Sequence, residues 1–300
     1  MNTSTKNNFK KNSKSFFFAS LFLKKKTFEN SAILYELCRY IDDIADKKSK
    51  AKEAKLKKIV KDLNHDSNSL KLANIKVLIS NNMINKIHIL QLIKGVSLDL
   101  KKKVRIKNHQ ELISYAYLVA GTVGLMMSNI LGVKEKIAYK YAVDLGIAFQ
   151  LTNIARDIVE DANMNRIYLP MSWKKLSISD IKSLDKKTII KLKSLSLKLL
   201  SVADEYYQSA QKGLAFLNLR SRFTVLLALI IYRQIGLKII KKSFSNLYKR
   251  EKVSFLEKVL CLFKCLAIFF LNINIHKKNY NHNGKLHKYI KNIVVINNKI

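Results

Sequence analysis

Two short groups of carboxylates are the residues of this 300-residue chain most suited to chemistry. They lie in the segments "RYIDDIAD" and "NIARDIVED" and comprise Asp42, Asp43, Asp46, Asp157, Glu160 and Asp161. The whole chain has only 21 Asp and Glu residues against 56 Lys and Arg residues. Because acids are scarce, their concentration at two places about 115 residues apart indicates a specific role.

The spacing of these carboxylates suits a divalent cation. Residues four apart on a helix share a face, with Cβ atoms about 5–6 Å apart, and Asp42/Asp46 and Asp157/Asp161 both have this spacing. Asn153 lies one turn before Asp157 on the same stripe. Like charges this close repel, whereas Mg²⁺ binds carboxylates together with waters and substrate phosphates. Two such pairs facing a cavity would hold Mg²⁺ ions around a diphosphate.

The alternative is that each group forms a solvated helix face that pairs with neighbouring Lys or Arg residues. A single D-x-x-x-D pattern is most often of that kind. Here the pattern occurs twice, each time within an otherwise apolar helical segment, and Arg39, Arg156 and Arg166 lie nearby. Guanidinium groups bind phosphate in a bidentate manner, which favours a shared diphosphate site.

The segments that must position these residues have helical periodicity. Residues 31–46 place apolar side chains along one stripe, and residues 112–131, 140–161 and 227–244 are long apolar helical patterns. One Pro and eight Gly leave few helix breaks. Alternating strand patterns are rare and short. The sequence therefore predicts an all-α catalytic domain over residues 13–276, with loose basic tails at 1–12 and 277–300.

The charge of the chain restricts its partners. The formal net charge is +35, no acid occurs in residues 1–26, and none follows Glu257. There is no zinc-finger spacing or aromatic-basic RNA-binding motif, which argues against a nucleic-acid partner. An anionic membrane surface fits better, since each nearby Lys or Arg adds roughly 1 kcal/mol to binding.

The apolar segments predict attachment to a membrane surface without crossing it. The segment "FFFASLFL" (16–23) is short, is closed by lysines and lacks a cleavage site, so it reads as the start of the fold. No run reaches the 18 apolar residues of a membrane span, and the apolar stretch within residues 259–275 could lie on a bilayer or in a core. Three cysteines are too few for a disulfide framework. We expect a cytoplasmic protein associated peripherally with the inner face of the membrane.

Four stretches in the same order resemble the squalene and phytoene synthases, the head-to-head isoprenyl diphosphate synthases. They are "SKSF" (13–16), "LYELCRYIDDIAD" (34–46), "YAYLVAGTVGLMM" (115–127) and "DLGIAFQLTNIARDIVEDANMNRIYLP" (144–170). The likeness continues through "EYY" and "YRQIGLK" and spans roughly residues 13–260. The fourth stretch is specific and is most similar to bacterial phytoene synthases.

This resemblance implies a fold, a reaction and a cofactor. The fold is the all-α isoprenoid synthase fold with a central cavity. The reaction joins two molecules of geranylgeranyl diphosphate through prephytoene diphosphate to give phytoene, the first step of carotenoid biosynthesis. Mg²⁺, or Mn²⁺ in its place, is the implied cofactor, and no NADPH is expected.

The resemblance also implies site residues. The Mg²⁺ carboxylates would be Asp42, Asp46, Asp157 and Asp161, with Asn153 as a further ligand and Glu160 in support. The residues implied to bind diphosphate are Ser13, Ser15, Arg39, Gln150, Arg166, Tyr232 and Arg250. Tyr35, Tyr117 and Tyr168 would line the reaction chamber, with Tyr117 taking part in catalysis, because aromatic faces stabilise carbocations. The small residues Ala120, Gly121 and Gly124 would leave room for the prenyl chains.

Four alternatives remain open from the sequence, and one of them is a basic nucleic-acid-binding protein, which the net charge of +35 would suit. A squalene or dehydrosqualene synthase would use the shorter farnesyl diphosphate, and squalene synthases also use NADPH. A head-to-tail prenyltransferase fits the first acidic motif but not the second with its flanks. Some relatives are non-catalytic assembly factors, a class that broken acidic motifs would indicate, whereas both motifs here are intact. The chain also departs from the family in "FLKKKTFEN" and over most of residues 47–100.

Overall fold

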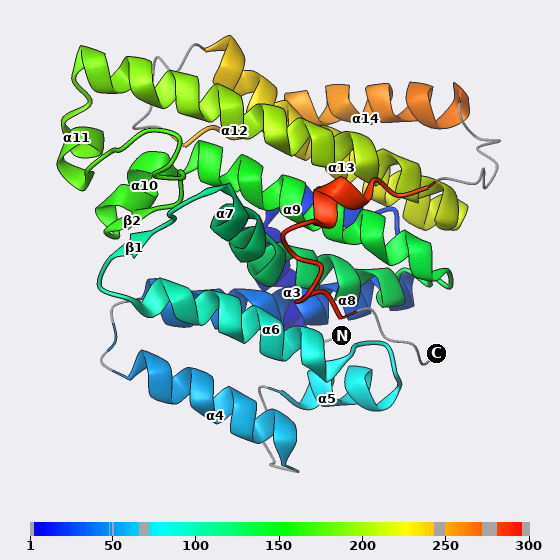
Figure 1. The fold of residues 1–300 in the computed structure, drawn as a ribbon. Helices are drawn as coiled ribbons and strands as arrows, with labels where there is room; N and C mark the ends of the chain where they lie inside the picture. Colours follow the sequence, from blue (N-terminus) through cyan, green and yellow to red (C-terminus); the bar gives the residue numbers. More distant parts are fainter. Residues whose placement is uncertain are drawn as a thin grey trace.

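The computed structural model describes residues 3–47, 49, 51–65, 72–242, 250–271 and 281–295. Within these residues the protein is a bundle of α-helices (Figure 1), which confirms the predicted fold class. The α-helices are α1 (Thr3–Asn12), α2 (Lys14–Ser20), α3 (Lys25–Asp46), α4 (Lys52–Asn64), α5 (Ala73–Ser80), α6 (Lys86–Ser97), α7 (His109–Ala116), α8 (Thr122–Ile130), α9 (Lys136–Arg156), α10 (Ile158–Asn163), α11 (Ile178–Ser183), α12 (Lys186–Gly213), α13 (Leu219–Lys241) and α14 (Phe255–Leu271). The short helical turns are η1 (Leu98–Leu100), η2 (Tyr117–Gly121), η3 (Leu214–Phe216) and η4 (Gly284–His287), and the two strands are β1 (Val104–Arg105) and β2 (Arg166–Ile167).

Helix α9 lies at the centre of the bundle. It packs against α8, α12 and α13, and its buried residues extend around most of its surface, as expected of a helix enclosed by others. In Figure 1, α12, α13 and α14 form one side of the molecule, and α4 and α5 lie at the opposite side. A second apolar core joins α3, α4, α5, α6 and α8. The long apolar patterns of the sequence thus become the central helices.

Small residues allow α9 to approach α8 and η2 at backbone distance. A Cβ atom on Gly124 would lie 2.2 Å from the carbonyl oxygen of Ala142, and one on Gly146 would lie 2.3 Å from that of Ala120. Gly121 faces the ring of Tyr117. The prediction that small residues here leave room for prenyl chains is therefore only part of their role: Ala120 and Gly124 do line a cavity, but Gly121 and Gly124 also serve helix packing.

Two expected continuous helices are interrupted. The pattern over residues 112–131 forms α7 and α8 joined by the π-helical turn η2. The pattern over residues 140–161 forms α9 and α10, which meet at Asp157, a residue with φ −107° and ψ 16°. The amide of Asp157 still donates to the carbonyl of Asn153, and the amide of Asp161 to that of Asp157. The i, i+4 relation of the second acidic motif therefore survives the break.

The strands β1 and β2 pair in parallel, with Val104 opposite Arg166. This short ladder fixes the backbone of the segment that follows α10. It thereby holds Arg166 in place beside the end of α3.

Both termini differ from the prediction of loose tails. Residues 3–12 form α1, and Phe9 is buried among the rings of Phe17, Phe28 and Tyr35. Residues 281–295 run along the outside of α7 and α9 (Figure 1), and the side chain of Ile290 is fully buried. Phe9 and Ile290 explain the difference, because each is an isolated apolar side chain in a polar segment that becomes buried against the helices.

Two helical stretches, His109–Ile130 and Leu219–Lys241, are long and apolar enough to cross a membrane by length and composition. Both are mostly buried inside the protein, as core helices are.

Candidate active site

A cavity of about 340 Å³ lies between α2, α3, α8, α9 and α13. Its walls are mainly apolar, and small residues such as Ala120, Gly124 and Ala142 line its middle. Asp42, Gln150 and Asn153 line it at the end where α3 and α9 carry the acidic motifs. The cavity therefore has a polar end and a long apolar interior.

The first acidic group ends helix α3 and is partly neutralised by cations. Asp43 pairs with Arg39 and with Lys47, each at 2.7 Å. Asp46 accepts a 2.8 Å hydrogen bond from the guanidinium of Arg166. Asp42 faces the cavity, and burial together with the charge of Asp46 raises its pKa to about 7.

The second acidic group lies at the junction of α9 and α10. Asp157 binds Arg156 through two hydrogen bonds of 2.7 and 2.6 Å and also binds Arg250 at 2.9 Å. Arg250 reaches Glu160 at 3.8 Å. Burial and the neighbouring charge of Asp157 raise the pKa of Asp161 well above its ordinary value.

Arg166 links the two groups. Its guanidinium donates to Asp46 and to the backbone carbonyls of Ala45 and Asp99. Its positive charge also offsets part of the rise in the pKa of Asp161. The structure thus brings the ends of α3 and α10 to one place, as the two acidic motifs predicted.

The donor set at this end of the cavity suits Mg²⁺. Among the described residues, the carboxylates of Asp42 and Asp161 have no Lys or Arg within ion-pair distance, and both have raised pKa values. The side-chain oxygen of Asn153 is buried without a hydrogen-bond partner in the same part of the structure. Crowded carboxylates and an unsatisfied amide oxygen are what a hard, oxygen-binding cation would satisfy. The residues therefore fit the implied metal.

An aromatic group lies beside this polar end. Phe16 stacks on Tyr232 at 4.5 Å between ring centroids, and Phe149 contacts both rings. Burial raises the pKa of Tyr232 above its ordinary value, and the positive charge of Arg156 offsets part of this rise. Phe16 and Phe149 line the cavity, as does Tyr35, whose ring packs on Phe9.

Four further predicted substrate-binding residues lie in or next to α2, α3 and α9, helices that border the cavity: Ser13, Ser15, Arg39 and Gln150. Ser13 is the N-cap residue of α2 but makes no side-chain capping bond, and Ser15 lies in the first turn of that helix. The side-chain amide of Asn153 donates to Gln150 at 3.4 Å. Arg39 lies one turn before Asp43 on α3, where its side chain is 41 % exposed.

Two predicted chamber residues do not line the cavity. Tyr117 is fully buried, and its hydroxyl donates to Gln91 at 2.8 Å and to the carbonyl of Ile293 at 3.3 Å. The π-helical turn η2 begins at Tyr117. The side chain of Tyr117 is covered by the C-terminal segment that contains Ile293. Tyr168 stacks on Tyr115 instead, at 4.8 Å. Neither tyrosine is among the residues that line this cavity, and their place in a reaction chamber stays a prediction.

Asp99 is a member of the polar network that the motifs did not indicate. It accepts hydrogen bonds from the hydroxyls of Tyr115 and Tyr168 at 2.9 and 2.7 Å, and burial raises its pKa. Its signal in the sequence is weak, an acid between two leucines after α6. Through Arg166 and Tyr168, Asp99 supports the polar end of the cavity without lining it.

A helical bundle around an apolar cavity, with two acidic motifs at one end, defines an isoprenoid synthase that acts on prenyl diphosphates. The sequence model of the family described as squalene/phytoene synthase matches residues 9–257. The chain belongs to this family.

Relatives named as phytoene synthases and a solved structure agree with this assignment. The chain is 32% identical to the 15-cis-phytoene synthase of Enterobacter agglomerans, over 83% of this chain and 90% of that protein. It is 31% identical to the 15-cis-phytoene synthase of Pantoea ananas, over 83% of this chain and 86% of that one. A dehydrosqualene synthase crystal structure matches with a TM-score of 0.80 and 27% identity, covering 89% of this chain and 96% of that chain.

Proposed function

We propose that the protein is a phytoene synthase, which condenses two molecules of geranylgeranyl diphosphate in a Mg²⁺-dependent reaction. The observation that carries the proposal is the cavity, which joins Asp42 and Asn153 at its polar end to a deep apolar interior. The similarity to two bacterial phytoene synthases over most of the chain supports the same activity.

The depth of the cavity supports a twenty-carbon substrate. Asn153 and Ala138 both line it, and a separation of 15 residues along α9 corresponds to about 22 Å. An extended chain advances about 1.2 Å per bond, so a geranylgeranyl chain of 16 backbone carbons spans about 18 Å, and a farnesyl chain of 12 about 13 Å. Ala138, Ser128 and Tyr141 line the far end, where Gly213 packs closely against Tyr141.

In this proposal the acidic motifs hold the metal and the arginines hold the diphosphate. Asp42, Asp46, Asp157, Asp161 and Asn153 would bind Mg²⁺ or Mn²⁺, with Glu160 in support, and the ion would supply positive charge against the leaving diphosphate. Arg39, Arg166 and Arg250 now pair with carboxylates. Arg166 and Arg250 pair with Asp46 and Asp157, so metal ligation by those two carboxylates would leave both guanidinium groups free to bind phosphate oxygens in a bidentate manner. Arg39, which pairs with Asp43, would reach the diphosphate beside them.

The rest of the chamber would protect the carbocations. The first substrate loses diphosphate, and its allylic cation is attacked by the double bond of the second, giving a cyclopropylcarbinyl diphosphate with loss of a proton. This intermediate loses its own diphosphate, rearranges and releases a second proton. The rings of Phe16, Tyr35 and Phe149 line the cavity and would stabilise positive charge through their π faces, and the apolar walls would exclude water. No electrons enter, so no NADPH is required.

A dehydrosqualene synthase is the second candidate, favoured by the TM-score of 0.80 to such an enzyme. It would join two farnesyl diphosphates at the same polar end. The intact acidic motifs argue against a non-catalytic assembly factor, since such a protein would not need to retain paired carboxylates.

Product analysis after controlled metal loading tests the proposed function. Purified protein is treated with EDTA, supplied with geranylgeranyl diphosphate, and assayed for phytoene with and without added Mg²⁺. We expect turnover only with Mg²⁺ or Mn²⁺, and a loss of at least about 100-fold in Asp157→Asn with an unchanged helical circular dichroism spectrum. Turnover that persists in EDTA, or near-native activity of this variant, would exclude the metal-dependent mechanism.

The exposed face of α14 supports the proposal of peripheral association with the inner face of the cytoplasmic membrane. Leu256, Leu260, Phe263 and Phe270 follow one another at helical spacing and are 63 to 74 % exposed, while Cys261 and Cys265 face the core. Phe22 contacts Phe223, which contacts Phe269 of α14. An apolar stripe on a strongly basic protein suits an anionic bilayer.

Sedimentation with vesicles tests the membrane proposal. Binding to anionic vesicles should weaken in high salt, and Phe263→Asp should weaken it in every salt concentration. Ile190→Asp is the matched control, because Ile190 is 69 % exposed and belongs to the start of α12, an end of that helix that lies beside α11 in Figure 1. Equal binding of both variants would rule out α14 as the attachment surface.

A further inference from the structure

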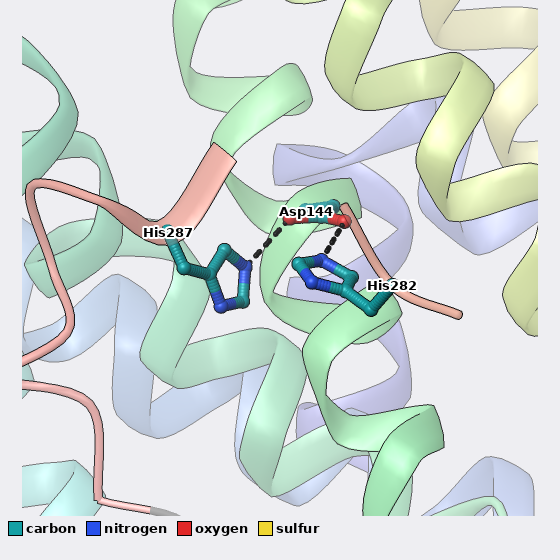
Figure 2. Close-up of side chains that lie close together, drawn as sticks. All are labelled: Asp144, His282 and His287. Carbon is teal, nitrogen blue, oxygen red and sulfur yellow. Dashed lines mark hydrogen bonds and ion pairs between the residues drawn. The ribbon is translucent and has the colours of Figure 1, made fainter. Parts of the chain in front are cut away.

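A buried carboxylate outside the candidate active site collects three polar partners. Asp144, on α9, is fully buried. It accepts a 2.6 Å hydrogen bond from the hydroxyl of Ser209 on α12. His282 Nε2 lies 2.9 Å from one of its oxygens, and His287 Nε2 lies 2.8 Å from the other (Figure 2).

Both histidines come from the C-terminal segment. His282 lies two residues before η4, and His287 is its last residue. Their side chains are 2 and 11 % exposed, and their ring centroids are 4.3 Å apart. The hydroxyl of Tyr206 holds the same segment by donating to the carbonyl of Leu286. The two rings are therefore held on either side of one carboxylate, each within hydrogen-bond distance of one of its oxygens, as Figure 2 shows.

The partners of Asp144 are unusual for this chain. The protein has 56 Lys and Arg residues but six His residues. Nevertheless, the ion pairs that Asp144 makes within the described part of the chain are with two histidines. A simple need for charge neutralisation would be met by any of the abundant lysines. Two imidazoles and a carboxylate instead form a set of metal ligands.

The distances are compatible with one ion bound between the three side chains. One ligand atom from each residue lies within 4.8 Å of the others. Zn²⁺ binds His nitrogen and carboxylate oxygen at about 2.0–2.2 Å in tetrahedral geometry, which separates neighbouring ligand atoms by roughly 3.3 Å. The nitrogen–oxygen distances would have to lengthen by about 0.4 Å, which small rotations of the imidazole rings can supply. Ser209 would serve as the outer partner that orients the carboxylate.

We propose that Asp144, His282 and His287 form a binding site for a transition-metal ion of the Zn²⁺ type, which fastens the C-terminal segment to α9. Imidazole ligands select such metals, whereas the carboxylate-rich end of the cavity selects Mg²⁺. Asp144 and Asp157 are 13 residues apart on one helix, about 20 Å. The two sites are therefore distinct in place and in metal preference, and this proposal is independent of the proposed reaction.

Titration with Co²⁺ tests the site directly, because tetrahedral Co²⁺ with nitrogen ligands absorbs strongly in the visible range. The full-length protein is stripped with EDTA and titrated in excess Mg²⁺, which occupies the carboxylate-rich site. We expect a visible band that saturates at one Co²⁺ per chain and disappears when Zn²⁺ is added. An apparent thermal midpoint that rises with Zn²⁺ is the second expected readout.

Matched variants locate the ion. His282→Gln and His287→Gln should each weaken Co²⁺ binding by more than about 10-fold. His109→Gln removes a histidine that stacks on Trp173 elsewhere and should bind Co²⁺ like the wild type. No visible band in the folded wild-type protein, or an equal band in all three variants, would overturn the proposal and leave a hydrogen-bonded Asp–His clamp. The wild-type titration alone distinguishes a metal site from such a clamp even if a variant fails to fold.

Discussion

Replacing Gly146 with Ala should force α9 away from the π-helical turn η2, against which Gly146 packs. The new Cβ would lie 2.3 Å from the carbonyl oxygen of Ala120, 2.7 Å from its carbonyl carbon and 2.9 Å from the Cα of Gly121, whereas ordinary contact begins at 3.4 Å. All three atoms belong to the backbone, so no rotamer change relieves the overlap. Overpacking of this kind costs about 3 kcal/mol, and the better helix propensity of Ala returns about 1 kcal/mol. We expect a net loss of roughly 2 kcal/mol.

Gly236→Ala is the matched control. Gly236 also lies within a buried helix, but its Cβ would meet only the methyl groups of Leu200, at 3.1 and 3.9 Å, and this side chain can adjust. That variant should equal the wild type or gain up to about 1 kcal/mol. Urea denaturation followed by circular dichroism measures both. A Gly146→Ala protein as stable as the wild type, or equal losses in the two variants, would refute the close-packing argument.

Three further predictions concern acid stability, chain length and diphosphate binding. His88 is buried, and burial lowers its pKa to about 4 from 6.5. As the pH falls, the unfolded chain binds the proton before the folded protein does, so the free energy of unfolding should fall by roughly 3 kcal/mol between pH 7 and pH 4. Urea denaturation of His88→Leu should show a smaller dependence on pH, and an unchanged dependence would assign the effect to another group. Ala138→Phe fills the far end of the cavity and should lower turnover of geranylgeranyl diphosphate at least about 10-fold while sparing farnesyl diphosphate; equal losses for both would argue against the depth argument. Arg250 is 45 % exposed, so Arg250→Gln should change the unfolding free energy by less than about 1 kcal/mol yet raise KM for the diphosphate; an unchanged KM would remove Arg250 from the site.

The sequence predicted the acidic end of the site because its signal is local. Carboxylates four apart on a helix share a face wherever that helix lies, so Asp42, Asp46, Asp157 and Asp161 could be paired before any packing was known. The break of the helix at Asp157 left this relation intact. The all-α fold followed in the same way from apolar periodicity.

Features that depend on contacts between distant segments were not predictable. Tyr117 is turned toward the C-terminal segment by its bond to Ile293, 176 residues away, and nothing in the neighbouring residues indicates this direction. The helical N-terminus depends on Phe9 meeting three other rings. The Asp144 cluster joins residues 138 and 143 positions apart. Because residues 1–12 and 277–300 are polar and basic in composition, the sequence did not predict the helices α1 and η4 within them.

Competition between two substrates tests the central claim most directly. The purified protein is given equal concentrations of farnesyl and geranylgeranyl diphosphate with Mg²⁺, with and without NADPH, and the extracted hydrocarbons are separated by chain length. We predict phytoene, the forty-carbon hydrocarbon, as the main product at the same yield with and without NADPH. A dominant thirty-carbon hydrocarbon, or a yield that requires NADPH, would contradict the proposed function.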